Sequence, residues 1–351
     1  MQRNYFSDVA HAIIRVMAVD QRQDWTQMVT KTERAARFLI ALLFCVTASA
    51  AKAAPVSGVK SILKSGASVG ADQMDSTRGQ AIASADLPWR SPEDLVEMGF
   101  KRSRVVIMNE AHSGLLRCVR TRLIGKRVLA AAHAQGVRHI AMEALNPKFA
   151  EEANKTRKVP KANGYLSQPE MISFIQSALD LGWTLIPYEA QAAQSPIIAA
   201  LGPRPADPQD AVEFDRKFQE TLLSKDYTNW REMEQAKNLV SSLKALPDNG
   251  KLFVWCGNSH HKESLSNNSD WIPMGYQFIQ LSGLDPFTID QTRTVEFAPG
   301  QTSSGSDLAR KYARDLAQLG GTAGFLKQEA PEGLKGISFD AVLLSTDNRL
   351  E

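Results

Sequence analysis

Val105-Val-Ile-Met-Asn-Glu-Ala-His112 is the stretch that decides the fold, and Leu252-Phe-Val-Trp-Cys-Gly-Asn-Ser-His260 is its counterpart further along the chain. Each is a short apolar run that ends in polar, chemically reactive residues. Such runs are typical of strands that are buried on both faces, as in parallel sheets. In open α/β sheets, ligands bind just beyond the carboxyl ends of the strands. The two histidines are therefore placed like residues of one site.

Further strands and helices alternate on both sides of these stretches. The alternation predicts an α/β fold with a mostly parallel central sheet, right-handed crossovers and helices on both faces. The site is expected at the C-terminal ends of the strands. The expected strands are Arg104–Met108, Arg138–Met142, Thr184–Tyr188, Lys251–Cys256, Tyr276–Leu281 and Phe339–Leu344. Helices are expected over 91–99, 113–135, 167–181, 207–246 (with a break near 226–228) and 307–319, and a polar flap over 154–163.

The N-terminal region resembles a secretory leader. Basic residues precede the apolar run 38–50, and Ala51-Lys-Ala53 fits an A-x-A cleavage pattern. The run is shorter than the roughly 20 apolar residues of a spanning helix, although a membrane anchor or a buried helix is the alternative. We expect an N-terminal extension with a signal peptide (1–53), a flexible linker (54–87) and a single α/β domain (88–351). Met1 and Met28 both fit as the start of the chain.

This leader implies a periplasmic or secreted protein without permanent membrane insertion. The whole chain has 41 Lys and Arg and 38 Asp and Glu. Residues 1–53 hold seven of the basic and four of the acidic residues, which leaves 34 of each for the rest. That balance argues against a nucleic-acid partner, which would require a basic excess or a basic face. A small-molecule or peptide substrate is the expected partner.

Cysteine is scarce beyond the leader. Cys118 and Cys256 are the cysteines that follow it, and two cysteines make no disulfide framework. A single bridge in an oxidising compartment and two unpaired buried thiols both fit the sequence, and the second is the favoured interpretation.

Acidic, imidazole and guanidinium groups collect at the carboxyl ends of the predicted strands. Carboxylates that lie close together raise one another's pKa, whereas a nearby Arg or protonated His lowers it. Such a cluster can tune one group to act as a base near neutral pH. Two histidines with a carboxylate can also hold a divalent metal, and the candidate ligands are His112, Glu143 and His260. The full set of candidates is Glu110, His112, Arg117, Glu143, Glu189, His260 and His261.

Each candidate also has a structural interpretation. Glu110 and His112 are placed to cap the following helix at the positive end of its dipole. Glu143 lies in an apolar setting, where an ion pair with a helix arginine would stabilise it. Glu189 fits a structural role equally well, and His261 is expected to be solvated or to lie behind His260.

Several common signatures are absent from the sequence. It has no G-x-S-x-G nucleophile elbow, no H-E-x-x-H and no phosphate-binding glycine loop. By contrast, Asn109-Glu110-Ala111-His112, Ala141-Met142-Glu143 and Gly257-Asn-Ser-His260, with the helix segment 231–238, resemble a known superfamily. It comprises erythromycin esterase-like proteins, ChaN-like haem-binding proteins and TIKI/TraB proteins. The resemblance covers roughly residues 100–290, and Asn109 departs from the first glycine of the signature, where its side chain is expected to narrow the approach.

The resemblance implies an α/β fold with its site at the strand ends, and divergent activities. TIKI-type members are regarded as metal-dependent peptidases, esterase-like members open a macrolide ester with a His/Glu-activated water, and ChaN-like members bind haem. Carried over by position, Glu110, His112, Glu143 and His260 form the site.

The sequence thus predicts a secreted hydrolase of ester or peptide bonds. Glu143 or Glu110 with His112 would activate water, directly or through a metal, and His260 and Arg117 would stabilise the oxyanion. One alternative is a periplasmic haem- or metal-binding protein without catalytic activity, and another is an inactive scaffold. The cofactor, whether a divalent metal, haem or none, stays open, and so does the oligomeric state.

Overall fold

The computed structural model describes residues 87–111, 115–265, 270–292, 312–330 and 338–345, with the backbone alone for residues 115–118. All of these residues fall in one compact unit, residues 84–351. The predicted signal peptide and nearly all of the linker lie outside the described residues, so both stay predictions. No helix in the described ranges combines the length and the apolar character needed to cross a membrane.

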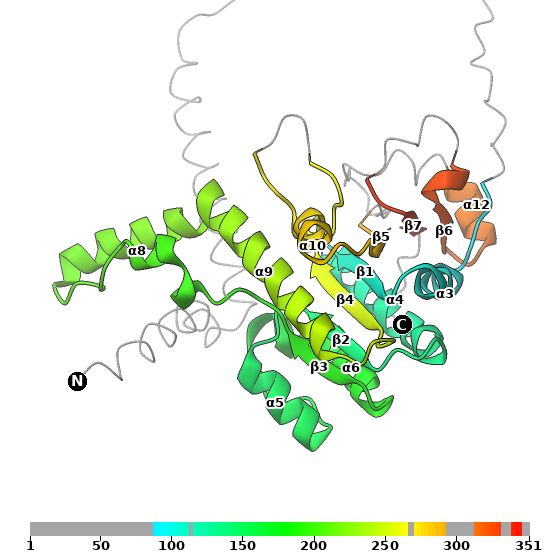
Figure 1. The fold of residues 1–351 in the computed structure, drawn as a ribbon, viewed down its shortest axis with the longest axis horizontal. Helices are drawn as coiled ribbons and strands as arrows, with labels where there is room; N and C mark the ends of the chain where they lie inside the picture. Colours follow the sequence, from blue (N-terminus) through cyan, green and yellow to red (C-terminus); the bar gives the residue numbers. More distant parts are fainter. Residues whose placement is uncertain (1–86, 112–114, 266–269, 293–311, 331–337, 346–351) are drawn as a thin grey trace, which may run out of the picture. The chain divides into compact units, whose positions relative to one another are not determined.

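A seven-stranded sheet forms the centre of the described unit (Figure 1). Its strand order is β3-β2-β4-β1-β5-β7-β6, and every neighbouring pair is parallel except β6 with β7. The predicted α/β fold with a mostly parallel sheet is therefore confirmed. The strands are β1 Val105–Glu110, β2 His139–Met142, β3 Thr184–Pro187, β4 Leu252–Gly257, β5 Phe287–Asp290, β6 Thr322–Leu326 and β7 Ala341–Ser345.

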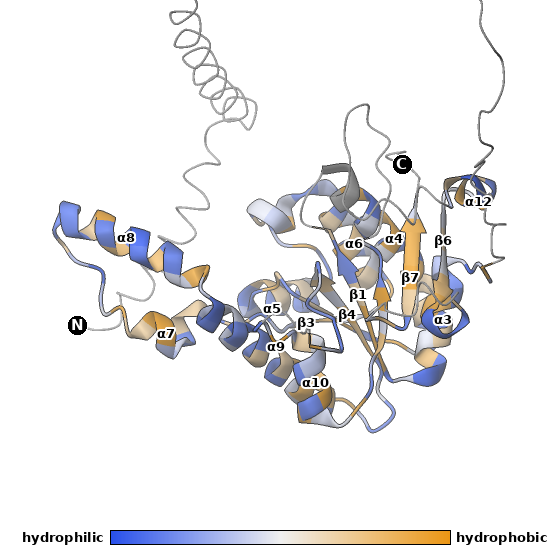
Figure 2. Cartoon of the chain, turned by 90° about the horizontal axis from the view of Figure 1, so that it is seen from above, coloured by the Kyte–Doolittle hydropathy of each residue, from blue (hydrophilic) through white to orange (hydrophobic). Residues whose placement is uncertain are grey.

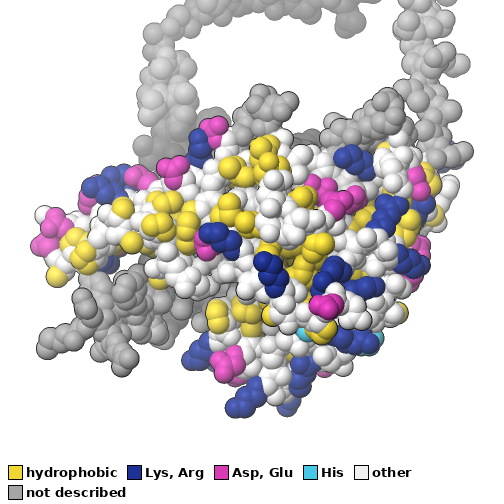
Figure 3. Space-filling model, viewed as in Figure 1, with side chains coloured by type: hydrophobic (Ala, Val, Ile, Leu, Met, Phe, Trp, Pro, Cys, Tyr) yellow, Lys and Arg dark blue, Asp and Glu magenta, His cyan; other side chains and the backbone are white. Residues whose placement is uncertain are grey.

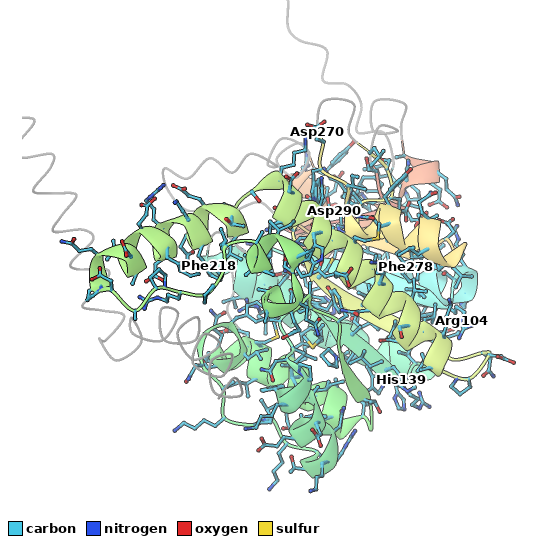
Figure 4. The ribbon with its side chains drawn as sticks, turned by 60° about the vertical axis from the view of Figure 1, so that its left-hand side comes forward. Arg104, His139, Phe218, Asp270, Phe278 and Asp290 are labelled. Carbon is cyan, nitrogen blue, oxygen red and sulfur yellow. The ribbon has the colours of Figure 1, made fainter. Side chains whose placement is uncertain are left out.

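The strand register brings distant pieces of sequence to one edge of the sheet. In β1 and β4, Glu110 lies opposite Gly257, and in β2 and β4, Met142 lies opposite Trp255. The residues that follow these strands therefore meet at the same carboxyl edge. Figure 4 shows Arg104 and His139, near the start of β1 and β2, towards the other edge, and Asp290 at the end of β5.

Helices cover both faces of the sheet. On one face lie α3 (Pro92–Arg102), α4 (Leu115–Ala134) and α6 (Pro169–Asp180), and on the other lie α9 (Lys225–Ala245) and α10 (Met274–Ser282) (Figure 1). Along β1 the side chains alternate, with Met108 facing α4 and Ile107 facing α9. Burial of these apolar faces stabilises the fold by about 25 cal/mol per Å² of apolar area.

Close packing of α4 on the sheet requires a glycine. A Cβ placed on Gly125 would lie 2.5 Å from the ring of Trp255, so any larger residue would push the helix away. Trp255 in turn packs edge-on against Phe174 of α6, with ring centroids 4.7 Å apart. This contact sets the distance between α4 and the strand that carries one half of the site.

The long helical region 207–246 is interrupted three residues earlier than predicted. It consists of α8 (Pro208–Leu222) and α9, and Ser224 begins α9 by accepting a hydrogen bond from the backbone N–H of Tyr227. Val212 and Leu223 are exposed, and α8 is largely hydrophilic, in contrast to β7 (Figure 2). Figure 3 shows apolar, acidic and basic side chains interspersed along this part of the surface.

One strand prediction near the C-terminus is wrong, and two strands there were not predicted. Residues 276–281 belong to the helix α10, which ends at Gly283 with a φ of 68°. Its buried residues Met274, Gln277 and Phe278 follow helical spacing. The strands β5 and β6 were not among the predicted strands.

The predicted flap over 154–163 is also partly helical. Helix α5 (Pro147–Thr156) extends into it. The side-chain amide of Asn154 makes two hydrogen bonds to the backbone of Leu185 in β3. Its Nδ2 donates to the carbonyl oxygen at 2.9 Å, and its Oδ1 accepts from the N–H at 2.8 Å. The amide thus covers the outer edge of the sheet in the manner of a neighbouring strand. The short helices are α7 (Pro196–Ala199) and α12 (Ala313–Gln318), and α12 is the described part of the predicted helix 307–319.

Candidate functional site

Glu143, the residue that follows β2, lies at the centre of the site. Its Oε2 accepts a hydrogen bond from the backbone N–H of Gly257 at 2.5 Å. Its Oε1 lies 2.6 Å from Nη2 of Arg231 and 3.6 Å from Nε2 of His260. The backbone N–H of Gly257 and the guanidinium of Arg231 are donors that stabilise a negative charge on this carboxylate at the strand ends.

His260 is oriented by a second carboxylate, from Glu232 on α9. Nδ1 of His260 lies 2.5 Å from Oε1 of Glu232, whose side chain is fully buried. The same Glu232 accepts hydrogen bonds from the indole of Trp271 at 3.0 Å and from the backbone N–H of Met274 at 2.7 Å. With Nδ1 facing Glu232, Nε2 is the ring nitrogen that faces Glu143 and the outside.

The pKa of His260 is raised above its ordinary value of 6.5. Burial lowers this pKa, but the hydrogen bond to Glu232 and the negative charges of Glu143 and Glu232 outweigh that effect. His260 therefore keeps a proton to a higher pH than a free imidazole does.

Arg231 joins two carboxylates at the same edge. Its Nη2 contacts Glu143 at 2.6 Å and Glu189 at 2.5 Å, and its Nε contacts Glu189 at 2.8 Å. Burial raises the pKa of Glu189, and the adjacent guanidinium opposes that rise. About a quarter of the Arg231 side chain remains exposed, so this group of charges borders solvent.

Glu110 lies in a different environment, on the α4 side of the sheet. Its Oε2 accepts hydrogen bonds from Nε of Arg122 at 2.9 Å and from the indole of Trp255 at 3.1 Å. Its Oε1 accepts a hydrogen bond from the hydroxyl of Tyr165. The Glu110 side chain is fully buried. Burial, followed by the charge of Glu110, raises the pKa of Tyr165, and the charge of Glu143 contributes as well. Tyr165 therefore lies within electrostatic reach of both carboxylates.

The structure brings three of the sequence-predicted residues together: Glu143 faces His260, and Arg231 joins Glu143 to Glu189. Glu110 is nearby but enclosed in its own ion pair. His112 lies outside the described residues, and Arg117 belongs to α4 with its side chain undescribed. Within the described ranges, no group of three or more His, Cys, Asp or Glu side chains is arranged to hold a metal ion. The predicted metal set depends on His112 and stays a prediction.

Three further sequence interpretations concern neighbouring residues. His261 is not solvated: it is fully buried and stacks on Phe339 with ring centroids 4.3 Å apart. Asn109 is 1% exposed, and its amide donates to Asp290 at 2.8 Å and accepts from the N–H of Gln291 at 2.8 Å, which ties β1 to the end of β5. Cys256 carries a free, buried thiol.

Sequence reasoning missed Glu232 and Arg231 as site residues. The segment 231–238 entered the sequence analysis only as part of the resemblance to the superfamily, but its pattern contains a signal for Glu232. Glu232 falls on the buried stripe of α9 that continues through Gln235, Ala236, Leu239 and Leu243. A carboxylate on an apolar helix face requires a partner, because an unpaired buried charge is very costly. That partner is His260.

The hollows on the described surface include one that borders the site and one that does not. One, of about 280 Å³, is lined in part by Glu189 and so borders the site. The other, of about 370 Å³, is lined by Arg102, Lys327, Gln328 and Asp340. Arg102 ends α3 just before β1 begins, so the larger hollow lies away from the strand ends that carry Glu143 and His260.

Comparisons with known proteins give matches in structure. No family model matches the chain, and no curated protein matches it. An erythromycin esterase mutant (EreC) in its open conformation matches with 13% identity, covers 73% of this chain and 97% of its own, and has a TM-score of 0.46. ChaN of Campylobacter jejuni, solved with cofacial haem, matches with 14% identity, 73% and 92% coverage and a TM-score of 0.42. The type III effector HopBA1 matches with 13% identity, 76% and 99% coverage and a TM-score of 0.39. Two of the groups that the sequence motifs resemble are thus among the structural neighbours.

Proposed function

We propose that this protein hydrolyses ester or peptide bonds with Glu143 and His260 as its central pair. One observation carries the proposal. His260 is held between a buried carboxylate, with Glu232 Oε1 at 2.5 Å from Nδ1, and a carboxylate at the rim, with Glu143 Oε1 at 3.6 Å from Nε2. An imidazole oriented by one acid and facing another is suited to proton transfer.

The separation between the pair leaves room for a shared water. At 3.6 Å, Nε2 of His260 and Oε1 of Glu143 are too far apart for a good direct hydrogen bond. A water at about 2.8 Å from each atom would hydrogen-bond to both. Such a water would be placed for attack on a carbonyl carbon bound at the rim.

The charges assign a role to each member of the pair. Glu143, as an anion, takes a proton from the attacking water. His260, whose pKa is raised above 6.5, donates the N–H of Nε2 in its protonated form to the carbonyl oxygen as negative charge develops there. The proton on Glu143 then passes to the leaving group as the tetrahedral intermediate collapses. A donor aimed at such an oxygen contributes about 3–4 kcal/mol to catalysis.

The experiment is a panel of 4-nitrophenyl esters and peptide amides, assayed with the wild type, Glu143→Gln and His260→Gln. We expect each variant to lose at least about 100-fold in kcat/KM. The double variant should lose little more, because residues that act as a unit are not additive. Glu234→Gln on the same helix is the matched control and should stay at the wild-type rate.

Two results would count against this function. One is that wild type turns over nothing, with or without added Mn²⁺ or Zn²⁺. The other is that Glu143→Gln and His260→Gln keep full activity. A parallel haem titration tests the alternative that the protein binds haem. In that case wild type shifts the absorption band of haem, and His260→Gln does not.

A further inference from the structure

A polar pocket of about 280 Å³ lies beside the site. Its walls include Glu189, Gln191 and Gln194 from the chain after β3, and Asn238, Ser241 and Ser242 from α9, together with the rings of two prolines. Ligand sites that enclose a whole small molecule span about 300–1,000 Å³. The polar pocket therefore fits one group of a larger substrate.

Glu189 belongs both to the polar pocket and to the charges of the site. The same Nη2 of Arg231 contacts Glu189 at 2.5 Å and Glu143 at 2.6 Å. A single guanidinium thus separates the polar pocket from the carboxylate that faces His260. A substrate whose scissile carbonyl lies at Glu143 can extend a neighbouring group into the polar pocket.

The polar pocket is close to neutral in charge. Arg231 compensates its carboxylate, Glu189, from two directions, with Nε at 2.8 Å and Nη2 at 2.5 Å. The other polar groups in its lining are amides and hydroxyls. A charged group would gain no opposite charge there, so the lining favours an uncharged group that can hydrogen-bond to amides and hydroxyls.

Several hydrogen-bonding atoms of this lining remain available. Asn238 donates its amide to the carbonyl oxygen of Tyr188 at 3.1 Å, which leaves its Oδ1 as an acceptor. Gln191 donates to the carbonyl oxygen of Glu189 at 3.1 Å, which leaves its side-chain oxygen as an acceptor. Among the described residues, the amide of Gln194 and the hydroxyl of Ser241 have no protein partner. Gln194 offers both a donor and an acceptor, so it can bind either the C=O or the N–H of another amide.

We propose that the polar pocket is a specificity subsite that holds an uncharged amide group of the substrate, next to the bond that is cleaved. This inference rests on the proposed hydrolase function for its kinetic consequence. The binding of an amide to the polar pocket can be measured without catalysis.

The binding experiment uses N-acetylalaninamide as the probe and the full chain as the protein, with saturation-transfer NMR as the readout. We expect binding to wild type and at least a 10-fold loss in Ser241→Leu, whose side chain would fill the polar pocket. Ala245→Leu adds the same side chain at an exposed position further along α9 and should bind like wild type. N-acetylalanine, which carries a carboxylate, should bind more weakly than the amide.

The kinetic experiment compares 4-nitrophenyl N-acetylglycinate with 4-nitrophenyl pentanoate, which has a similar length without the amide. We expect Ser241→Leu to lower the ratio of kcat/KM for the two esters by at least 10-fold, mainly through KM, relative to Ala245→Leu. Because both variants meet the same two esters, differences in intrinsic ester reactivity cancel.

The outcomes separate the two proposals. Absence of amide binding to wild type, or equal binding to Ser241→Leu and wild type, overturns the subsite whatever the enzyme hydrolyses. Tighter binding of the carboxylate, or of methyl glucoside, overturns the amide class. If no ester is cleaved, the hydrolase proposal fails, and the binding comparison alone then decides whether the polar pocket takes an amide.

Discussion

Two acid clusters lie at the carboxyl edge of the sheet, and they differ in burial. The closed cluster, Glu110 with Arg122, Tyr165 and Trp255, faces α4, and its two charged side chains are 0% and 3% exposed. The open cluster, Glu143 with Arg231, Glu189 and His260, faces α9, and Arg231 and His260 are 25% and 16% exposed. Each cluster begins with a glutamate at the end of a parallel strand.

The difference shows that the position of an acid at a strand end does not determine its role. Residues two apart in a strand lie on the same face of the sheet. Glu110 therefore lies on the same face as Met108, towards α4, and Glu143 lies on the same face as Ala141, towards α9. The α4 side is sealed by aromatic rings, so Glu110 holds the fold together there. The α9 side reaches solvent, so Glu143 can meet a substrate.

The largest expected effect is on the stability of the closed cluster. Arg122→Met removes the guanidinium that hydrogen-bonds to the buried carboxylate of Glu110 at 2.9 Å and should reduce the free energy of unfolding by about 3–5 kcal/mol. Urea unfolding followed by circular dichroism measures this loss. Adding Glu110→Gln to Arg122→Met should restore part of the stability, since the buried negative charge is then removed as well. A loss below about 1 kcal/mol would show that Glu110 reaches water.

The contrast between a closed and an open environment recurs in two adjacent histidines, His261 and His260, and it predicts that stability depends on pH. His261, unlike His260, is fully buried, and neither of its ring nitrogens has a hydrogen-bond partner among the described residues. Burial lowers the pKa of His261 to about 4, from 6.5 in the unfolded chain. The unfolded state therefore binds the proton more tightly, and stability is lost as the pH falls from about 6.5 towards 4, by roughly 2–4 kcal/mol. The control is His261→Phe, which keeps an aromatic ring against Phe339 and should make unfolding less dependent on pH in this window. Equal acid sensitivity in both proteins would contradict the prediction.

An intermediate effect is expected for catalysis in the open cluster. Glu232→Gln removes a negative charge that raises the pKa of His260, so that pKa should fall. Because His260 acts in its protonated form, activity is lost as the pH rises through its pKa. The basic limb of the kcat/KM profile should therefore move to lower pH, with a loss of about 10-fold at pH 8. A uniform loss at all pH values would indicate a structural role for Glu232 alone.

Much of this architecture follows from local sequence pattern. The apolar runs before Glu110 and Glu143 predict buried strands, and parallel strands bring their carboxyl ends to one edge. The side of the sheet that each glutamate faces, and the helix residue that pairs with it, depend on packing between distant elements. Arg122 and Arg231 are two of many helix arginines, and short-range pattern cannot select them.

The errors in the predicted helices and strands also arise because packing between distant elements decides these segments. The segment 274–282 is a short apolar run that fits a strand or a helix, and its contact with α9 selects the helix. Strand β6, Thr-Ala-Gly-Phe-Leu, contains a glycine and lacks a β-branched run, so its local preference for a strand is weak. Its antiparallel pairing with β7 determines its structure.

The smallest expected effect is on stability, and it comes from replacing the guanidinium of Arg231 rather than that of Arg122. Arg231→Lys keeps the charge but loses the fork that joins Glu143 to Glu189, and because this pair borders solvent the loss of unfolding free energy should stay within about 1 kcal/mol. Arg122→Lys in the closed cluster should cost more, since a lysine there leaves buried hydrogen bonds unmade. Urea unfolding of the two variants side by side gives the comparison directly. If Arg231→Lys proves the more damaging of the two, the open cluster is a structural element, and its assignment as the reactive side of the sheet is wrong.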